Sequence, residues 1–341
     1  MSRSLKIWIP TIRAGSGADV FALRLSQALR RAGHEPLLQW FDRRYEFLPE
    51  LLRRYRKPPA IDVIHADSSN AWAFLGRDAP VVATVHHLVH DPAYAPYRSS
   101  LQALHHRLNI RWREALAIRH SAAVTAVSSY VAQTVKDVFG RESVNVIGNW
   151  VNNDLYTSSL NYRPIQSGKF RLLMVGNQSR RKGYDLLPAF SKALGANFDL
   201  RCTAGLRDER GGSELPNVST LGKLSEEELI SEYQHCDAVV SLSRYEGFGY
   251  TALEGMACGK PFIGFHTSGL TDVVVDEVTG FLLPINDISA LAARCVQLAE
   301  HPSMLEHMGQ AGRERALSVF DESTAANAYV ELYRKIISVN S

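Results

Sequence analysis

Short apolar runs rich in β-branched residues alternate with amphipathic stretches along almost the whole chain. In the first half, strands are expected at 5–10, 61–65, 81–86, 121–126 and 144–147, and a helix at 18–32, which Gly33 terminates. In the second half, strands are expected at 170–175, 200–204, 238–242 and 261–265, and helices at 184–194 and 322–337. This alternation predicts parallel sheets with helices on both faces, the α/β class.

A polar stretch at 157–168 interrupts the pattern, which then restarts. A chain of 341 residues is too long for one ordinary core and suits two domains. We expect Rossmann-like domains at 1–158 and 169–321, and a C-terminal helix at 322–341 that packs back toward the first domain. Two doubly wound sheets that face a central cleft offer a ligand site at the carboxyl ends of their strands.

The composition is globular, with 45% hydrophobic and 21% charged residues. The cysteines are far apart and form no C-x-x-C pair, so they are expected to be buried thiols in a reducing compartment: Cys202, Cys236, Cys258 and Cys295. The apolar run near the N-terminus is too short for a signal peptide, and no run reaches the roughly 18 residues of a membrane-spanning helix. The sequence therefore predicts a cytoplasmic protein.

The formal net charge is only +3, but it is unevenly distributed. Residues 1–160 hold 20 basic and 13 acidic side chains, whereas residues 161–341 hold 18 basic and 22 acidic ones. An evenly basic surface would suggest nucleic acid. This division instead suggests that the first domain faces an anionic partner, and no nucleic-acid partner is expected.

The most informative segment is RYEGFGYTALEGMACGKP at 244–261, directly after an expected strand. Gly247 and Gly249 would let the backbone approach a ligand closely. A helical pattern begins near Tyr250, so the amides of Gly249, Tyr250 and Thr251 would point out of a helix N-terminus. Such amides form an anion site that suits a phosphate.

Charged side chains accompany this anion site. Glu246 lies in the loop and Glu254 in the next helical turn, and both are expected to face the cleft, where they could accept hydrogen bonds from hydroxyls. The loop VGNQSRRKG, after the first strand of the same domain, carries Arg180, Arg181 and Lys182. Cations at the end of a strand would neutralise a leaving diphosphate.

Two further segments follow strands of the first domain. In VVATVHHLVH, His86 ends a buried strand and is expected to point into the cleft. The spacing of His86 and His90 invites comparison with a zinc site, but a zinc-protease helix needs Glu where this chain has His87, so no metal site is expected. The loop RAGSGAD supplies Gly15 and Gly17, and it is similar to a dinucleotide fingerprint without the third glycine.

Together, these segments resemble retaining glycosyltransferases of the family 4 type, which have the GT-B fold. The segment from Glu246 to Glu254 matches their E-x7-E motif. Further segments agree in order and spacing: RRAGHE at 30–35, IDVIHAD at 61–67, TVHH at 84–87, TAVSSYVAQTV at 125–135, VIGNWVN at 146–152 and GLTDVVVDEVTGFLLP at 269–284. The resemblance covers nearly the whole chain, and the motifs are specific as a set.

The resemblance implies roles for the candidate residues. Glu254 would hold the ribose hydroxyls of the nucleotide, and Lys182 would bind the diphosphate. Glu246 and His86 would contact the donor sugar near the reacting centre. The amides beside that sugar would belong to Gly247, Phe248 and Gly249. The phosphate and acceptor side would be shaped by Gly15 and Gly17.

Two positions depart from the family pattern. The family reads G-R-x4-K in the basic loop, whereas this chain has Asn177 at the arginine position, so Arg180 or Arg181 would supply the charge. The family reads N-G-V-D near the domain junction, whereas residues 149–152 of this chain read NWVN. A tryptophan therefore stands where the family has a glycine.

The resemblance implies a retaining hexosyltransferase that moves a sugar from a UDP- or GDP-sugar to a glycan or lipid-linked acceptor, in cell-surface polysaccharide or lipopolysaccharide synthesis. No D-x-D motif occurs, so the reaction is expected to need neither a metal nor another cofactor. A glycosidase would also use two carboxylates but would not need the cationic loop. A broken G-x-G-x-x-G disfavours a dehydrogenase. A non-catalytic or epimerase-type GT-B protein that binds nucleotide sugars is the alternative.

A basic, apolar segment at 41–57, FDRRYEFLPELLRRYRK, suggests contact with a membrane. Its apolar side chains recur at helical spacing: Phe47, Leu48, Leu51, Leu52 and Tyr55. A second basic stretch spans 101–119. Such a helix can lie among lipid headgroups, where each cation adds about 1 kcal/mol at an anionic surface. The segment therefore predicts peripheral association with the inner face of the membrane, and an ordinary helix with a solvated basic face fits it equally well.

Overall fold

The computed structural model of the chain describes residues 3–158, 168–204 and 215–340. It divides into two compact units, one of residues 1–149 and 322–341 and the other of residues 150–321. Most of the polar stretch at 157–168 lies outside the described residues. Each unit contains a six-stranded sheet, and every strand pair in both sheets is parallel.

The sheet of the first unit has the strand order β2-β1-β3-β4-β5-β6. Its strands are β1 (Lys6–Ile12), β2 (Glu35–Phe41), β3 (Val63–Asp67), β4 (Val81–Val85), β5 (Ala123–Ala126) and β6 (Asn145–Val146). Its longer helices are α1 (Gly17–Arg31), α4 (Arg111–His120), α5 (Ser129–Phe139) and α12 (Glu322–Asn340). Its shorter helices are η1 (Arg43–Glu46), η2 (Pro49–Arg54), α2 (Ser68–Ala71), η3 (Trp72–Phe74), η4 (Ala95–Tyr97), α3 (Ser100–His105) and η5 (His106–Ile110).

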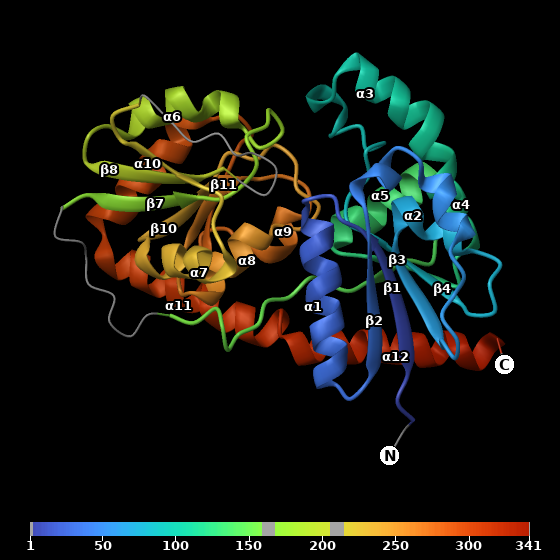
Figure 1. The fold of residues 1–341 in the computed structure, drawn as a ribbon. Helices are drawn as coiled ribbons and strands as arrows, with labels where there is room; N and C mark the ends of the chain where they lie inside the picture. Colours follow the sequence, from blue (N-terminus) through green and yellow to red (C-terminus); the bar gives the residue numbers. More distant parts are fainter. Residues whose placement is uncertain (1–2, 159–167, 205–214, 341) are drawn as a thin grey trace. The chain divides into compact units, whose positions relative to one another are not determined.

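The sheet of the second unit has the order β12-β11-β10-β7-β8-β9. Its strands are β7 (Phe170–Met174), β8 (Phe198–Thr203), β9 (Val218–Gly222), β10 (Ala238–Ser241), β11 (Phe262–Phe265) and β12 (Gly280–Leu283). Its helices are η6 (Tyr184–Leu186), α6 (Leu187–Leu194), α7 (Glu226–His235), α8 (Tyr250–Ala257), α9 (Leu270–Val273), α10 (Ile288–Glu300) and α11 (Pro302–Val319). The predicted α/β class is confirmed, and both units are doubly wound, as Figure 1 shows.

In both sheets the strand order reverses beside the first strand of the unit. The reversal falls between β1 and β3 in the first unit and between β7 and β10 in the second. At such a switch point the loops after the two strands diverge to opposite faces, which leaves room for a ligand outside their carboxyl ends. Three of the loops that the sequence singles out, those after β1, β7 and β10, begin there, whereas the segment with His86 follows β4.

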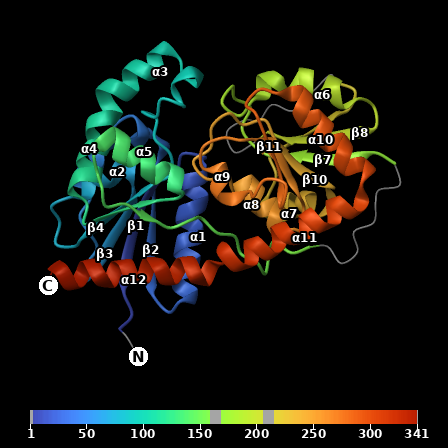
Figure 2. The ribbon, with the colours of Figure 1, turned by 180° about the vertical axis from the view of Figure 1, so that it is seen from behind.

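The C-terminal helix α12 completes the first unit, and Figures 1 and 2 show it running across that unit. The hydroxyl of its Tyr333 is hydrogen-bonded to Nδ1 of the buried His65 on β3. The second ring nitrogen of His65 lies 2.6 Å from Thr84 Oγ1 on β4. Arg31 of α1 also forms an ion pair with Glu322. The core of the first unit therefore includes the last helix of the chain.

The boundary of the N-terminal domain differs from the one expected at residue 158. Residues 150–158 belong to the second unit, where Trp150, Val151 and Tyr156 are buried. Val151 forms a β-bridge with Asp321, and Arg313 donates a hydrogen bond to the carbonyl of Tyr156. The apolar side chains of this short segment thus place it with the second unit, although polar residues flank them.

The prediction of an amphipathic helix at 41–57 is wrong. The segment forms only η1 and η2, two short turns of 3-10 helix. Leu52, which the helical spacing places with the exposed apolar residues, is buried, and the hydroxyls of Tyr45 and Tyr55 lie 2.7 Å apart. The apolar residues of this segment are divided between the core and the surface, so they do not form one continuous face.

The expectation that the cysteines are buried thiols is confirmed, because Cys202, Cys236, Cys258 and Cys295 are all buried and free. Burial raises the pKa of the thiols of Cys202, Cys236 and Cys258 to about 12, which keeps them protonated and unreactive. Among the described residues, no helix combines the length and the apolar character needed to cross a bilayer.

Candidate functional site

The switch point of the second unit brings the two predicted loops of that unit together. The loop after β7 ends in Lys182, and the loop after β10 contains Glu246. Lys182 Nζ forms a close ion pair with Glu246 Oε1, and Arg181 Nη1 lies 3.7 Å from Glu246 Oε2. Both carboxylate oxygens therefore face a cation. The structure assembles these three predicted residues into one charged cluster, which we call the Glu246 cluster.

Burial and the paired charges together set the protonation of the Glu246 cluster. Burial alone would raise the pKa of Glu246, but Lys182 and Arg181 outweigh it, and the pKa is lowered. Burial lowers the pKa of Lys182, and Glu246 partly opposes this shift. The carboxylate is thus held in its charged form at neutral pH. A carboxylate that is compensated by two cations is a poor nucleophile but a stable acceptor for hydroxyl groups.

A buried arginine that the sequence analysis missed ties the two loops together. Arg244 donates two hydrogen bonds to the carboxylate of Asp185, at 2.6 and 2.9 Å, and a third at 2.6 Å to the carbonyl of Arg180. Gly183, with φ of +73°, allows the close approach of the loops, because a Cβ atom there would lie 2.0 Å from the carbonyl oxygen of Leu242. These contacts fix the backbone from which Lys182 projects.

Arg180 and Arg181 were the alternatives for the arginine that the family has at position 177, and the structure distinguishes them. Arg181 reaches Glu246 and also donates a hydrogen bond to the carbonyl of Tyr245 at 2.8 Å. The Arg180 side chain is exposed, and its charge contributes to the low pKa of Asp185. Of the two, Arg181 therefore belongs to the Glu246 cluster.

The helix N-terminus predicted at Tyr250 is present, because α8 begins there. Gly249 precedes it with φ of +115°, and a Cβ at Gly249 would lie 2.7 Å from the Leu270 side chain. The first amides of α8 have no acceptor within the helix, which leaves Tyr250 and Thr251 suited to an anion. Phe248 packs its ring against Phe320, so its side chain serves the core.

Other residues brace the loop that carries Glu246. The backbone amide of Glu246 donates to Ser268 Oγ at 2.8 Å, and the amide of Gly269 donates to the carbonyl of Glu246 at 2.9 Å. Thr267 Oγ1 donates to the carbonyl of Arg244 at 2.7 Å. Gly247, next to Glu246, therefore lies in a loop that is held from the β11–α9 connection.

Glu254, the second glutamate of the motif, is enclosed by two tyrosines. Its carboxylate is buried and accepts a hydrogen bond from the hydroxyl of Tyr233 at 2.9 Å. The hydroxyl of Tyr156 lies 3.5 Å from the other oxygen. Two buried tyrosines therefore hold this carboxylate, one from α7 and one from the segment after Trp150, and its contact with the ribose stays a prediction.

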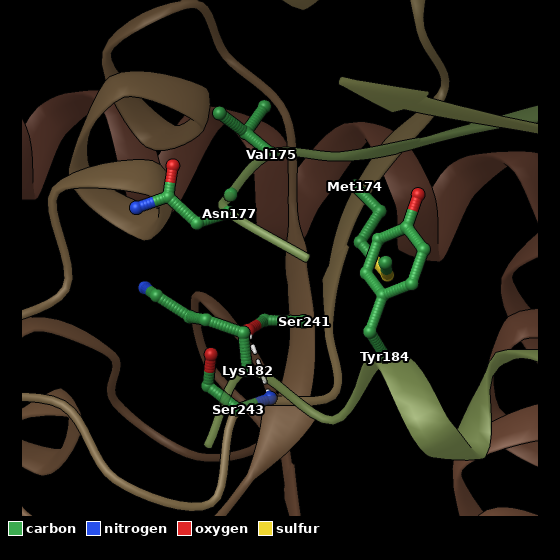
Figure 3. Close-up of a pocket in the computed structure, with 8 residues that line it drawn as sticks. Met174, Val175, Asn177, Lys182, Tyr184, Ser241 and Ser243 are labelled. Atoms are coloured by element: carbon green, nitrogen blue, oxygen red, sulfur yellow. Dashed lines mark hydrogen bonds between the residues drawn. The ribbon is translucent and has the colours of Figure 1, made fainter. Parts of the chain in front are cut away.

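A small, open hollow lies at the carboxyl ends of β7 and β10 (Figure 3). Its walls are formed by Met174, Val175, Gly176, Asn177, Lys182, Tyr184, Ser241 and Ser243. Asn177 stands where the family has arginine, so this wall offers an amide in place of a cation. Lys182 belongs both to the wall of the hollow and to the Glu246 cluster. The hollow and the cluster therefore form one candidate site.

In the first unit, the predicted His86 lies just beyond β4, beside residues that the sequence analysis did not single out. Its Nε2 lies 3.8 Å from Asp67 Oδ2, and its ring meets the ring of Phe21 edge to face at 4.6 Å. The other oxygen of Asp67 accepts a hydrogen bond from the amide of Ser69 at 2.8 Å. Burial lowers the pKa of His86, and Asp67 opposes this shift.

We expect Asp67→Asn to lower the pKa of His86 further, because the substitution removes the charge that favours the imidazolium. Titration of the histidine ring signals by NMR, with the His86 signal assigned from a His86→Gln variant, measures this shift. Asp78→Asn, at an exposed aspartate of the same unit, is the matched control and should leave the titration unchanged. An unaltered His86 titration in Asp67→Asn would contradict this electrostatic contact.

The other histidines of this segment have separate surroundings. His90 Nε2 lies 3.4 Å from Glu114 Oε2 inside the unit. Burial lowers the pKa of His90 to about 4 and raises the pKa of Glu114 to about 8, so at neutral pH both are uncharged and the proton resides on the carboxyl group. His87 packs near Tyr94. His86 and His90 thus face different carboxyl groups.

The loop with Gly15 and Gly17 is closed by a carboxylate. Asp19, in the first turn of α1, accepts hydrogen bonds from the amides of Ala14 and Gly15, at 3.3 and 2.9 Å, and from Ser16 Oγ at 3.3 Å. Gly15 has φ of +66°, which suits this tight turn. The carboxylate of Asp19 therefore accepts hydrogen bonds from the loop itself, and the role of Gly15 and Gly17 toward a phosphate or an acceptor stays a prediction.

Comparison with known families gives two adjacent matches. Residues 36–155 match the model described as Glycosyltransferase Family 4, and residues 161–315 match the model described as Glycosyl transferases group 1. The first match covers most of the N-terminal unit, and the second contains the Glu246 cluster, the hollow and α8.

Curated relatives agree with this assignment. The chain is 29% identical over 202 residues to an uncharacterized glycosyltransferase of Methanocaldococcus jannaschii, which covers 58% of this chain and 55% of the relative. It is 26% identical to glycogen synthase of Mycobacterium tuberculosis over 268 residues, and this alignment covers 75% of this chain and 63% of the relative. The chain therefore spans less than two thirds of the length of either relative.

Solved structures share the fold. Sucrose-phosphate synthase from Thermosynechococcus elongatus superposes with a TM-score of 0.84 at 21% identity, covering 98% of this chain and all of the other. HepE of Anabaena, solved in complex with UDP-glucose, superposes with a TM-score of 0.73 at 19% identity, covering 97% of this chain and all of the other. Together with the two adjacent family matches, this likeness makes the chain a member of the GT-B glycosyltransferases, with a family 4 region followed by a group 1 region.

Proposed function

We propose that this chain is a hexosyltransferase that takes its sugar from a UDP- or GDP-sugar and transfers it to a glycan or a lipid-linked acceptor. The observation that carries the proposal is the Glu246 cluster, with Lys182 and Arg181 on one carboxylate in the loop that leads into α8. Cations and a helix N-terminus suit the diphosphate of a nucleotide sugar. The carboxylate suits the hydroxyl groups of the sugar.

Each part of the site has a proposed task in the donor complex. Lys182, Arg181 and the first amides of α8 bind the diphosphate and stabilise the charge that it gains as the glycosidic bond breaks. Glu246 accepts hydrogen bonds from hydroxyls of the donor sugar, and Glu254 accepts them from the ribose. His86 contacts the donor sugar. The solved complex of HepE with UDP-glucose supports a donor of this class.

We further propose that the reaction retains the anomeric configuration and needs no metal ion. The acceptor hydroxyl attacks the anomeric carbon on the face that the diphosphate leaves, its oxygen forms the new glycosidic bond, and its proton passes to the leaving phosphate. The two cations at Glu246 support this route, because they make the nearest carboxylate a poor covalent nucleophile. Lys182 and the α8 amides take the electrostatic task that a metal performs in other transferases.

The acceptor side is proposed to lie in the first unit, around His86, Asp67 and the Asp19-closed loop. Carboxylates and an aromatic ring, that of Phe21, suit an acceptor that is rich in hydroxyl groups. A saccharide attached to a lipid or to a growing cell-surface polysaccharide, including lipopolysaccharide, has this chemistry. The basic excess of residues 1–160 supports an acceptor that carries negative charge.

The proposal is tested in two steps. A panel of UDP- and GDP-sugars is screened for thermal stabilisation of the chain, since a ligand of the native state raises its stability by mass action. The stabilising donor is then incubated with saccharide acceptors, and NMR of the product reports the anomeric configuration. We expect one donor to stabilise the chain, nucleotide release to require an acceptor, and the product to keep the donor configuration.

Each part of the proposal has its own contradicting result. A product of inverted configuration contradicts retention and leaves the transferase assignment in place. Epimerisation of the donor without an acceptor favours the epimerase-type alternative. Stabilisation by a nucleotide sugar without turnover on any acceptor favours a non-catalytic binder.

A further inference from the structure

One helical segment of the first unit presents a continuous apolar surface to solvent. α3, η5 and α4 follow one another without a break from Ser100 to His120. Along this segment the exposed large apolar side chains recur every three or four residues: Leu101 (80% exposed), Leu104 (54%), Leu108 (60%), Trp112 (44%) and Leu116 (38%). We call this set the leucine face. Contiguous exposed apolar patches of this kind mark interaction sites on folded proteins.

The opposite face of the same segment is packed into the unit. Ala117 and Ile118 are buried there. Trp112 of the leucine face is only partly exposed, because its ring also meets that of the buried Trp72 at 5.3 Å. Arg113 is also buried and forms an ion pair with Glu50 of η2. One side of the segment is therefore packed against the rest of the first unit. The helix is apolar on a second side as well, and that side carries the exposed leucines. Figures 1 and 2 show α3 at the end of the unit opposite to α12.

Positive charge accompanies the leucine face. Arg107, Arg111 and Arg119 are exposed on the same segment, and within the described residues none of them forms an ion pair. The sole acidic residue in the sequence from 100 to 120 is Glu114, which is buried beside His90. The exposed surface of the segment thus combines leucines with cations and carries no carboxylate.

This combination points to an anionic lipid bilayer. Leucine and tryptophan side chains can enter the boundary between headgroups and acyl chains, and arginines beside them remain at the level of the anionic headgroups. A second copy of the chain fits less well, because a two-fold symmetric contact would place the same arginines against each other without compensating carboxylates. An acidic protein partner would explain the arginines but not the exposed row of leucines.

We propose that the leucine face docks this chain on membranes that contain anionic phospholipids. The proposal goes beyond the transfer reaction and does not depend on it, because binding to a bilayer requires neither donor nor acceptor. Of the two basic stretches in the membrane prediction, 41–57 does not form an amphipathic helix, so the proposal keeps only the second, which lies in the segment from Ser100 to His120.

Co-sedimentation of the full chain with lipid vesicles tests the proposal. The vesicles contain phosphatidylcholine alone or phosphatidylcholine with phosphatidylglycerol, at low and high salt. We expect sedimentation with the anionic vesicles at low salt, and a loss at high salt because the ions screen the arginines. The variant Leu101→Ser/Leu104→Ser/Leu108→Ser should lower the bound fraction at least about 10-fold, because it removes most of the apolar area that enters the bilayer.

Matched controls separate this surface from general effects. The variant Leu23→Ser/Leu37→Ser/Leu317→Ser replaces three exposed leucines elsewhere and should bind like the parent chain. Arg107→Gln/Arg111→Gln should weaken binding, whereas Arg54→Gln/Arg56→Gln, from the segment 41–57, should not. The arginine pair also keeps the test valid if circular dichroism shows that the leucine triple variant is unfolded.

Three results would overturn the proposal. The first is no sedimentation of the parent chain with anionic vesicles at low salt. The second is an equal loss of binding in a leucine-face variant and its matched control. The third is a parent dimer, seen by light scattering, that the leucine-face variants convert to a monomer without any change in vesicle binding, because the face would then contact a second copy.

Discussion

Lys182→Ala is expected to lower turnover by at least about 100-fold, the scale of one lost electrostatic contact to a developing charge. The lysine approaches Glu246 from the loop after β7 and also lines the hollow at the strand ends. In the proposed reaction the diphosphate gains charge as the glycosidic bond breaks. The loss should therefore fall mainly on kcat, with a smaller change in KM.

Steady-state kinetics with the stabilising donor measure this effect. Lys192→Ala, at an exposed lysine of α6, is the matched control and should keep normal turnover. Lys182→Arg should recover part of the activity, because it keeps the charge. Near-normal kcat in Lys182→Ala would show that the lysine is not the main cation, and the same assay on Arg181→Ala would then reveal whether Arg181 carries the role.

Glu254→Ala is expected to weaken nucleotide binding by about 10- to 100-fold, the value of a charged hydrogen bond worth roughly 1.5–3 kcal/mol. The same change should lower the free energy of unfolding by about 1–3 kcal/mol, because the buried hydroxyl of Tyr233 loses its acceptor. Isothermal titration calorimetry with UDP and GDP measures the first effect, and urea denaturation measures the second.

A second variant separates a direct ribose contact from a purely structural role. Tyr233→Phe removes one of the hydrogen bonds to Glu254 and keeps the carboxylate, so it should retain most of the nucleotide affinity. If Tyr233→Phe loses as much affinity as Glu254→Ala, the carboxylate acts through its packing. Unchanged affinity in folded Glu254→Ala would remove Glu254 from the donor site.

The sequence predicted the parts of the fold that depend on local pattern. The apolar runs at 81–86, 170–175, 238–242 and 261–265 correspond to β4, β7, β10 and β11 within one or two residues, because parallel strands are buried on both faces and stay apolar throughout. The start of α8 at Tyr250 was also predicted, because the helical pattern of the sequence begins there, directly after Gly249. These signals lie within a few residues of the elements that they specify.

Features that depend on distant contacts were missed or misplaced. The segment 41–57 has the spacing of a helix, but Pro49 begins η2 there and Leu52 enters the core. Residues 150–158 look like the end of the first domain, but Val151 pairs with Asp321. Neither partner can be read from nearby sequence, so local pattern could not decide either case.

The candidate site shows the same division. Lys182, Glu246 and His86 were identified because they follow strands, but other polar residues of the site were not. Arg244 and Asp67 lie inside the quoted segments, yet nothing in the sequence shows which side chains they contact. Tyr233 lies outside those segments. Asp19 was visible in the sequence, but its hydrogen bond from the amide of Gly15 was not. Partner side chains of this kind become apparent only from the packed structure.

The discontinuous first unit has a consequence for synthesis on the ribosome. The chain leaves this unit at Asn149 and returns to it at Glu322, so all of the second unit emerges before α12 does. Until then His65 lacks the hydroxyl of Tyr333, and the pocket that Tyr329 and Tyr333 fill is open. Nascent domains fold as their residues become available. The second unit can therefore finish folding first, although the first unit begins to emerge earlier.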